Sequence, residues 1–183
     1  MRKIPSPSKT SAGVITVRPA PGNPRKALVS FAGRTERAAI GRGEMRSRKR
    51  EGDGATPIAA MPLLGGYLRA DRIVPPVSRL KLTRIRPDML WCDAPGHPSY
   101  NRPVRAPFAA SCETMARGDG LYDVCLVMDW NMRVRRRNGG SAIFFHLIRP
   151  GYQPTEGCIA VSLPAMRRLL AFARKGTVVK VIR

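Results

Sequence analysis

Prolines and glycines interrupt this chain so often that only short elements of secondary structure can form between them. The 183 residues include 17 prolines and 17 glycines, and apolar residues make up 43% while aromatic residues make up 6%. Frequent turns between short apolar runs are typical of β-rich folds. A chain of this length can build one domain with its own core and is too short for two ordinary ones. We therefore expect a single, mainly β domain.

Short β-forming runs are spaced along the chain. Residues 1–12 are rich in Pro, Ser and Lys, so we expect a disordered basic tail there and a domain over residues 13–183. Runs rich in β-branched or apolar residues predict strands at 14–17, 27–31, 141–148, 158–162 and 177–182. The first two strands should pair as a meander.

One helix is expected near the C-terminus, before the last strand. Ser162 is a suitable N-cap and Gly176 would end the helix. The apolar face of this helix would consist of Leu163, Met166, Leu169, Leu170 and Ala173.

Two basic segments are expected at the surface. The segment 41–57 has four glycines and predicts a surface loop, because its spacing fits neither a Walker motif nor a dinucleotide fingerprint. The run 133–137 predicts a charged hairpin tip, with Asn138 and Gly139 supplying the turn.

The charge of the chain is strongly one-sided. It carries 33 Lys and Arg residues against 12 Asp and Glu, a formal net charge of +21. Such a balance implies a polyanionic partner or surface. Nucleic acid, the carboxylate-rich peptides of a cell-wall polymer and an anionic membrane all satisfy it, so charge alone does not choose among them.

The cysteines do not have the spacing of a metal site. Cys92, Cys112, Cys125 and Cys158 form no C-x-x-C pair and no finger spacing with the two histidines. A chain this long can build a core without disulfides, and a buried free thiol is common in an apolar run such as that around Cys125. We expect no structural metal and no cofactor.

No export or membrane segment is apparent in the sequence. The N-terminal stretch is basic but lacks the apolar run of about 7–15 residues and the small-residue cleavage site of a signal peptide. Nor is there an uncharged apolar run of about 18 residues. On this ground alone, the default compartment is the cytoplasm.

Two residues near the C-terminus could act as a nucleophile and its base. His146 lies within the apolar run "SAIFFHLI", and Cys158 begins the next β-forming run after a loop. Neighbouring strands would bring the thiol to a histidine that takes its proton, and backbone N–H groups of Gly157 and Cys158 could hold an oxyanion. The same residues also fit a buried core histidine and a buried cysteine, so spacing alone leaves both interpretations open.

The sequence around this pair resembles the signature of the L,D-transpeptidase (YkuD) family. In that family a histidine is followed, after a loop, by Ser or Thr, His, Gly and the nucleophilic Cys. The matching residues here are His146, Thr155, Gly157 and Cys158, and Glu156 stands where the commoner motif has a second histidine. The resulting "PTEGC" is similar to the motif of a short, single-domain proteobacterial branch.

Four further segments resemble landmarks of that branch, in the same order. They are "KREGDGATP" (49–57), "PSYNRPV" (98–104), "DGLYD" (119–123) and "GGSAIFFH" (139–146). The resemblance therefore covers the chain from about Val14 to its end.

The resemblance implies a β-sandwich or barrel-like catalytic domain with a C-terminal helix and a final strand. It also implies that Cys158 attacks an L,D-peptide bond of a peptidoglycan stem and forms a thioester, with His146 as base and N–H groups at Gly157 and Cys158 as oxyanion hole. Transfer of the acyl group to an amine of another stem makes a transpeptidase, and transfer to water makes an L,D-carboxypeptidase. No single residue decides between 3-3 and 1-3 cross-links.

We expect five residues to contact the substrate: Arg149, Thr155, Glu156, Arg102 and Tyr122. A guanidinium suits a stem-peptide carboxylate because it pairs with both oxygens, although either arginine could equally be a solvated charge. Glu156 could orient the histidine, receive an ammonium group or cap the loop, and Tyr122 could instead pack in the core. The expected partners are peptidoglycan stem peptides and no specific nucleic acid, and the protein should be a monomer.

Cell-wall chemistry also bears on location. Polymerised peptidoglycan lies outside the inner membrane, so this function favours the periplasm even though no export signal is apparent. The alternative is a nucleic-acid-binding module, suggested by the net charge and by the arginines of 46–50 and 133–137. That alternative lacks a helix-turn-helix, a zinc finger and aromatic stacking platforms.

Overall fold

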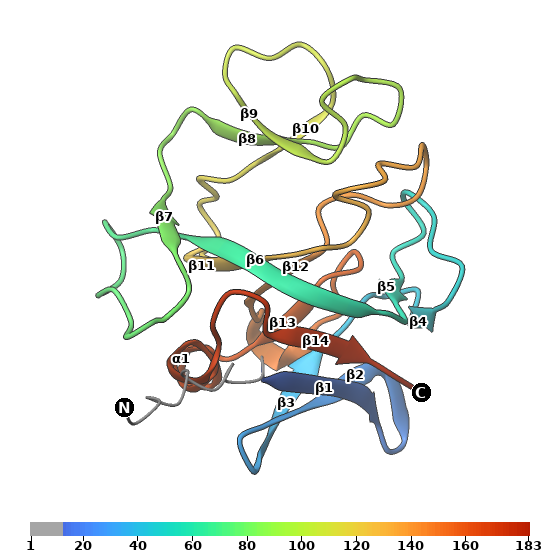
Figure 1. Ribbon diagram of the computed structural model, residues 1–183, viewed down its shortest axis with the longest axis vertical. Helices are drawn as coiled ribbons and strands as arrows, with labels where there is room; N and C mark the ends of the chain where they lie inside the picture. Colours follow the sequence, from blue (N-terminus) through green and yellow to red (C-terminus); the bar gives the residue numbers. More distant parts are fainter. Residues whose placement is uncertain (1–12) are drawn as a thin grey trace, which may run out of the picture.

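The computed structural model describes residues 13–183 (Figure 1). The tail expected at residues 1–12 lies outside the described residues. The strands are β1 (Val14–Ala20), β2 (Asn23–Phe31), β3 (Arg34–Ala39), β4 (Met45–Arg46), β5 (Thr56–Pro57), β6 (Ala60–Leu68), β7 (Leu82–Arg84), β8 (Met89–Cys92), β9 (Arg102–Arg105), β10 (Cys112–Thr114), β11 (Val124–Met128), β12 (Phe144–Leu147), β13 (Ile159–Val161) and β14 (Val178–Val181). The helices are α1 (Leu163–Phe172) and the short 3-10 helix η1 (Pro150–Tyr152).

The main sheet closes into a barrel. Its strand order is β11-β12-β13-β3-β2-β1-β14-β6-β7, and β11 also pairs with β6. All strands of this sheet except β7 therefore belong to a closed ring. Most neighbours are antiparallel, including the expected meander of β1 and β2. The parallel pairs of this sheet are β1–β14, β12–β13 and β6–β7. The mainly β, barrel-like fold with a helix before the last strand is confirmed.

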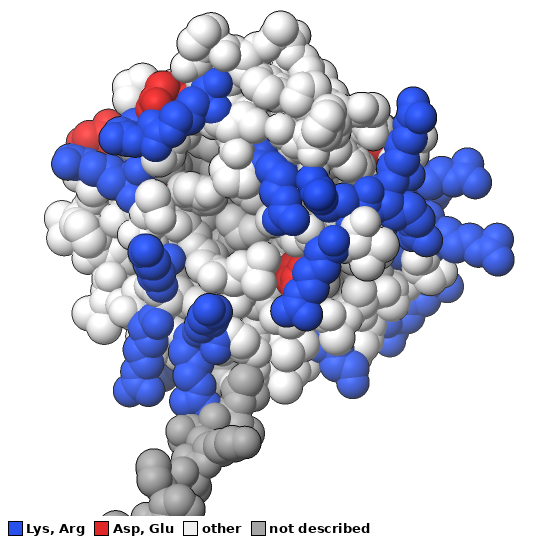
Figure 2. Space-filling model, turned by 45° about the horizontal axis from the view of Figure 1, so that its top comes forward, with Lys and Arg blue, Asp and Glu red and all other residues white. Residues whose placement is uncertain are grey.

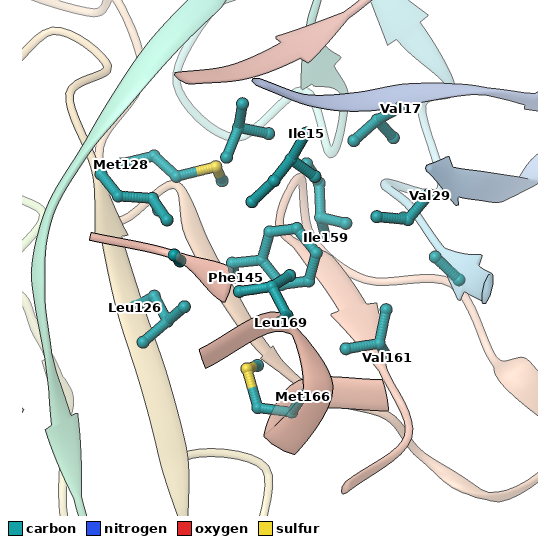
Figure 3. Close-up of a cluster of buried hydrophobic side chains, with 14 of the residues drawn as sticks. Ile15, Val17, Val29, Leu126, Met128, Phe145, Ile159, Val161, Met166 and Leu169 are labelled. Atoms are coloured by element: carbon teal, nitrogen blue, oxygen red, sulfur yellow. The ribbon is translucent and has the colours of Figure 1, made fainter. Parts of the chain in front are cut away.

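The barrel interior is a continuous apolar core. It is filled by inward side chains of the strands, and α1 adds its buried face (Figure 3). The labelled members are Ile15, Val17, Val29, Leu126, Met128, Phe145, Ile159, Val161, Met166 and Leu169. At about 25 cal/mol per Å² of apolar surface removed from water, this burial is the main stabilising contribution of the fold.

A second, smaller core lies outside the barrel wall. The three-stranded sheet β10-β8-β9 stands beyond β11 and β12, at the top of Figure 1. Trp91 from β8 packs edge-on against Phe144 from β12, with ring centroids 4.9 Å apart. Strands β11 and β12 are therefore buried on both faces, which explains why they read as unbroken apolar runs rather than alternating ones.

The C-terminal helix begins where the sequence indicates and ends earlier. The Ser162 side chain accepts a hydrogen bond from the Ala165 N–H, as an N-cap does. The helix stops at Phe172 because Ala173 is extended, with its N–H still bonded to the Leu169 carbonyl. Gly176, predicted as the stop, instead has a φ of +85° in the turn that leads into β14. Within residues 13–183, no helix is both long enough and apolar enough to cross a membrane.

The prediction of a plain surface loop at 41–57 is wrong in part. This segment contains the short parallel pair β4–β5 and buries Met45, Lys49, Ala55 and Thr56. Met45 joins the barrel core, and Thr56 Oγ1 donates to the Gly157 carbonyl at 2.9 Å, so the segment packs against the loop that leads into β13. The predicted turn at Asn138 and Gly139 is present, with the Gly139 N–H bonded to the Arg136 carbonyl, but it lies within a longer connection between β11 and β12.

Candidate active site

Strand pairing brings the predicted histidine and cysteine to the same face of the barrel wall. In the parallel pair of β12 and β13, His146 lies opposite Ala160, and Cys158 lies two residues before Ala160. Because side chains alternate along a strand, His146 and Cys158 both point away from the barrel core. Both line one cavity of about 190 Å³. The sequence-based expectation that the two strands are neighbours is confirmed.

The strands β12 and β13 form the base of this cavity, and three other parts of the chain enclose it. These are the 41–57 segment, the three-stranded sheet with the residues that follow it to Tyr122, and the loop before Cys158. The lining residues are Lys49, Glu51, Gly52, Asp93, Glu113, Arg117, Leu121, Tyr122, Ser141, Ala142, His146, Arg149, Gln153, Pro154, Thr155, Glu156, Cys158 and Ala160. Among the residues at 13–183, no group of three or more His, Cys, Asp or Glu side chains is arranged to hold a metal ion.

The Cys158 thiol is buried and held by backbone groups. Its Sγ–H donates to the Ala142 carbonyl at 3.2 Å, and Sγ accepts the Phe144 N–H at 3.3 Å. Burial, together with the negative charge of Glu113, raises the pKa of the Cys158 thiol to about 12, against the opposing effect of the Phe144 N–H. The thiol is therefore neutral in the resting protein near pH 7.

The His146 imidazole is neutral and oriented. Its Nδ1 lies 2.7 Å from the Leu147 carbonyl oxygen, which can only accept, so Nδ1 carries the proton and Nε2 keeps its lone pair. Burial lowers the pKa of His146 to about 4, although the bond to Leu147 acts in the opposite direction. The Tyr122 ring packs at 5.4 Å from the imidazole and restricts its position.

Two threonines form hydrogen bonds that fix the loop from Thr155 to Cys158. Thr155 Oγ1 donates to the Cys158 carbonyl at 2.6 Å and accepts the Gly157 N–H at 3.2 Å. From the opposite wall, Thr56 Oγ1 donates to the Gly157 carbonyl at 2.9 Å. Thr155 thus contributes to the site by positioning the loop. The Gly157 N–H, expected to hold an oxyanion, is engaged by Thr155 in this structure.

A buried asparagine positions the residue that binds the Cys158 thiol. Asn101 Oδ1 accepts from Trp91 Nε1 and from the Ala142 N–H, both at 3.1 Å, and its Nδ2 donates to the Trp130 carbonyl. Ala142 has a φ of +49°, a strained value for alanine, so the bond to Asn101 helps to hold it there. Since Ala142 accepts the Cys158 Sγ–H, the segment 98–104 acts on the site through the backbone.

Glu51 ties the 41–57 segment to the loop before β12. It accepts hydrogen bonds from the Tyr100 hydroxyl and from the Ser141 hydroxyl, the latter at 2.8 Å. Nearby, the buried Lys49 donates to Asp53 at 2.5 Å. These residues lie in segments that the sequence marks as landmarks, but nothing in a single sequence assigns a role to Lys49, Glu51 or Asn101.

Charged groups of both signs face the cavity near Tyr122. The Tyr122 hydroxyl donates to Glu113 at 2.6 Å, and burial raises the pKa of the Glu113 carboxyl. Arg117 lies over the Tyr122 ring and pairs through two nitrogens with Asp119, at 3.0 and 2.6 Å. Arg149 lies 3.8 Å from the same Asp119 carboxylate. Glu113 and Arg117 are functional candidates that sequence reasoning missed. They lie on β10 and just after it, about 40 residues before the Cys158 motif in the sequence, so that motif does not point to them.

Four of the five residues predicted to contact the substrate lie at the cavity, and one does not. Arg149, Thr155, Glu156 and Tyr122 all line the cavity. Glu156 is at its rim, exposed and paired with Arg42 at 2.8 Å, and the His146 Nδ1 bonds to a carbonyl rather than to this carboxylate. Arg102 lies on β9, at the edge of the small sheet opposite to β10, and it lines a separate hollow with Tyr67 and Pro103.

A basic groove adjoins the cavity. Figure 2 shows Lys and Arg side chains gathered over this side of the molecule, with few Asp and Glu among them. The groove shares Lys49 and Glu51 with the cavity. Its exposed arginines are Arg48, Arg50, Arg136 and Arg137, none of which forms an ion pair with another residue of the described chain.

The position of Gly157 leads to a stability prediction. Gly157 has a φ of +128°, and a Cβ there would lie 2.8 Å from the Ala55 carbonyl oxygen. Gly151 also has a positive φ, +75°, but a Cβ there would meet nothing within 4 Å. We expect Gly151→Ala to cost about 1–2 kcal/mol for the backbone alone. Gly157→Ala should cost about 1–3 kcal/mol more, because its φ is more strained for alanine and because the added Cβ clashes with Ala55. Equal losses in urea unfolding would contradict the close contact between the two walls.

The lowered pKa of His146 predicts a dependence of stability on pH. Because the folded-state pKa, about 4, is below the unfolded value of about 6.5, the unfolded chain binds a proton that the folded chain excludes between these values. The free energy of unfolding should therefore fall by on the order of 3 kcal/mol as the pH drops from about 6.5 to about 4. Urea unfolding at several pH values should show a smaller fall for His146→Gln than for the wild type. An identical fall in both proteins would contradict a buried neutral imidazole.

A family model identifies the family to which this chain belongs, whereas two other comparisons give no match. Comparisons with curated proteins and with solved structures found no match. The L,D-transpeptidase catalytic domain (YkuD) family model matches residues 25–181, nearly the whole chain, and this range includes every residue that lines the cavity. The family implies an enzyme of the L,D-transpeptidase type with a peptidoglycan substrate. The barrel and the resemblance in sequence agree with the match, and the chain therefore belongs to the YkuD family of L,D-transpeptidase catalytic domains.

Proposed function

We propose that this protein is a cysteine-dependent L,D-transpeptidase that joins stem peptides of peptidoglycan, with Cys158 as nucleophile and His146 as base. The observation that carries the proposal is the placement of both side chains on one face of two adjacent parallel strands, in a single cavity. The second contribution is the tautomer of His146, whose Nε2 is free to accept a proton.

The reaction begins from a neutral pair. When a stem peptide enters, the Cys158 thiol leaves the Ala142 carbonyl and passes its proton to His146 Nε2, and Sγ attacks the carbonyl carbon of the L,D-peptide bond. The imidazolium then protonates the leaving amine, and a thioester remains on Cys158. The neutral amine of the acceptor then attacks the thioester carbonyl and loses a proton to His146 as the C–N bond forms. The C–S bond breaks, and His146 returns that proton to the departing Cys158 thiolate.

The oxyanion of each tetrahedral intermediate would be held by the N–H groups of Gly157 and Cys158. For this, the Gly157 N–H exchanges its 3.2 Å bond to Thr155 for a bond to the oxyanion. Such an exchange is favourable because a charged acceptor forms a stronger hydrogen bond than a hydroxyl. Thr155 keeps its bond to the Cys158 carbonyl, so the loop retains its shape.

The charges around the cavity suit a stem peptide, which carries carboxylates and ammonium groups close together. Arg149 is half exposed and is held only at 3.8 Å by Asp119, so it can pair with a substrate carboxylate. Glu156 at the rim and Glu113 inside provide acceptors for an ammonium group. The cavity thus offers partners for both the carboxylate and the ammonium group at the distal end of a diaminopimelate side chain.

Three finer aspects are part of the proposal. The acceptor is an amine for a transpeptidase and water for an L,D-carboxypeptidase, and the cross-link is of the 3-3 or the 1-3 type according to the bond attacked. The protein acts in the periplasm, where polymerised peptidoglycan lies. The experiment below separates the two acceptors and the two bonds.

Purified wild-type protein and the Cys158→Ala variant should be incubated with defined disaccharide tripeptides and tetrapeptides, and the products identified by mass spectrometry. We expect cross-linked dimers from the wild type and at least a thousandfold loss in Cys158→Ala, since no other group of the site can form the thioester. Cys125→Ala is the control, because Cys125 is a buried cysteine that does not line the cavity. The residue released from the donor identifies the bond attacked.

The alternatives give different products in the same assay. Shortened monomers without dimers would identify a carboxypeptidase. Activity retained by Cys158→Ala would contradict cysteine catalysis, and no product from any stem would contradict the assignment of peptidoglycan as substrate.

The basic groove predicts salt-sensitive binding to the cell-wall polymer. In the Cys158→Ala background, replacing Arg48, Arg50, Arg136 and Arg137 by Gln should weaken binding to purified sacculi by about tenfold at low salt, since exposed charges contribute on the order of 0.2–1 kcal/mol each. Replacing Arg18, Arg25, Arg34 and Arg37, which lie on β1, β2 and β3, makes the same change in charge elsewhere. Equal losses for both variants would contradict a specific role of the groove. Loss of duplex DNA binding with sacculus binding unchanged would favour a nucleic-acid partner.

A further inference from the structure

Two cysteines outside the candidate site lie directly opposite each other. In the antiparallel pair of β8 and β10, Cys112 is the partner of Cys92. Residues that face each other across an antiparallel pair point to the same side of the sheet. Both thiols are free in the structure, Cys92 buried and Cys112 partly exposed.

The hydrogen bonds on either side of this pair define its type. The Asp93 N–H donates to the Ser111 carbonyl at 3.2 Å, and the Met115 N–H donates to the Met89 carbonyl at 3.0 Å. Hydrogen-bonded and non-hydrogen-bonded pairs alternate along an antiparallel ladder. Residues 93 and 111 therefore form a hydrogen-bonded pair, and Cys92 with Cys112 form the adjacent non-hydrogen-bonded pair.

This type of pair has the geometry that a disulfide needs. In a non-hydrogen-bonded pair the Cα atoms are about 4.5 Å apart and the side chains approach more closely than in the other type. A disulfide joins Cα atoms about 4.4–6.8 Å apart. Rotation of the two side chains can therefore form the bond without movement of the strands.

We propose that Cys92 and Cys112 form a cross-strand disulfide that joins β8 to β10 in an oxidising environment. The Cys112 thiolate attacks a small-molecule disulfide such as oxidised glutathione, forming a mixed disulfide and releasing one glutathione thiolate. The Cys92 thiolate then attacks the Cys112 sulfur and displaces the second glutathione. In total, two protein thiols are oxidised and one glutathione disulfide is reduced to two thiols. The partly exposed Cys112 is the sulfur that the oxidant reaches first.

The bond would stabilise one wall of the candidate site. Asp93 and Glu113, the residues that follow the two cysteines, both line the cavity. The cysteines point to the opposite side of the small sheet from Glu113 and Trp91, so the bond would form without entering the cavity. This inference concerns the stability of the small sheet and does not depend on the proposed reaction.

The test is to equilibrate the wild-type protein and the Cys158→Ala variant with oxidised glutathione, block the remaining thiols and digest with trypsin. Each cysteine is in a separate tryptic peptide, with Cys92 in residues 85–105 and Cys112 in residues 106–117. We expect those two peptides to be joined in both proteins, and the number of free thiols to fall by two. The oxidised wild type should melt about 5–10 °C above its reduced form, and Cys112→Ser should show no such difference.

Two results would overturn the proposal. One is the recovery of both peptides unlinked, either blocked or each carrying glutathione. The other is a bond from Cys92 or Cys112 to a different cysteine. Cys112 is the better of the two cysteines to replace, because its side chain is partly exposed whereas that of Cys92 is buried. The melting curve of the Cys112→Ser variant under reducing conditions shows whether it folds.

Discussion

The parallel pairing of β12 with β13 is the constraint on which the rest of the structure depends. Each strand sends alternate side chains into the barrel core and the others to the opposite face. Phe145 and Ile159 anchor the strands in the core, so the strands cannot shift by one residue without placing His146 inside the barrel. The same register that fills the core therefore places His146 and Cys158 together outside it.

Polar groups around the site act mainly through the backbone. Asn101 holds Ala142, Thr155 and Thr56 hold the loop at Gly157, and Glu51 joins two walls of the cavity. Buried polar groups of this kind are costly unless every one has a partner. Their partners come from the segments 49–57, 98–104 and 139–146 as well as from the loop before Cys158, so these distant parts of the chain meet at one place. Burial keeps the thiol and the imidazole neutral, so this pair is not a thiolate and an imidazolium before substrate arrives.

Much of this organisation could be predicted from sequence alone, because it depends on local pattern. The short β runs, the N-cap at Ser162 and the adjacency of the strands of His146 and Cys158 follow from alternation and turn residues, and the structure agrees with them. The end of the helix did not follow, because Ala173 leaves the helix to join the core while Gly176 is needed for the next turn. Arg102 was expected at the site on its neighbourhood in sequence, but the small sheet turns it away.

The sequence by itself determined the β-rich class, the basic surface and the pair of residues suited to nucleophilic chemistry. These are properties of composition, period and residue type, which a linear pattern carries. Only the tertiary structure decided that Lys49, Glu51, Glu113 and Arg117 share a cavity with that pair, that Glu156 faces Arg42, and that Cys92 meets Cys112. Such contacts depend on the closure of the barrel and on how the small sheet packs against its outer wall, and both result from long-range packing that no local pattern specifies.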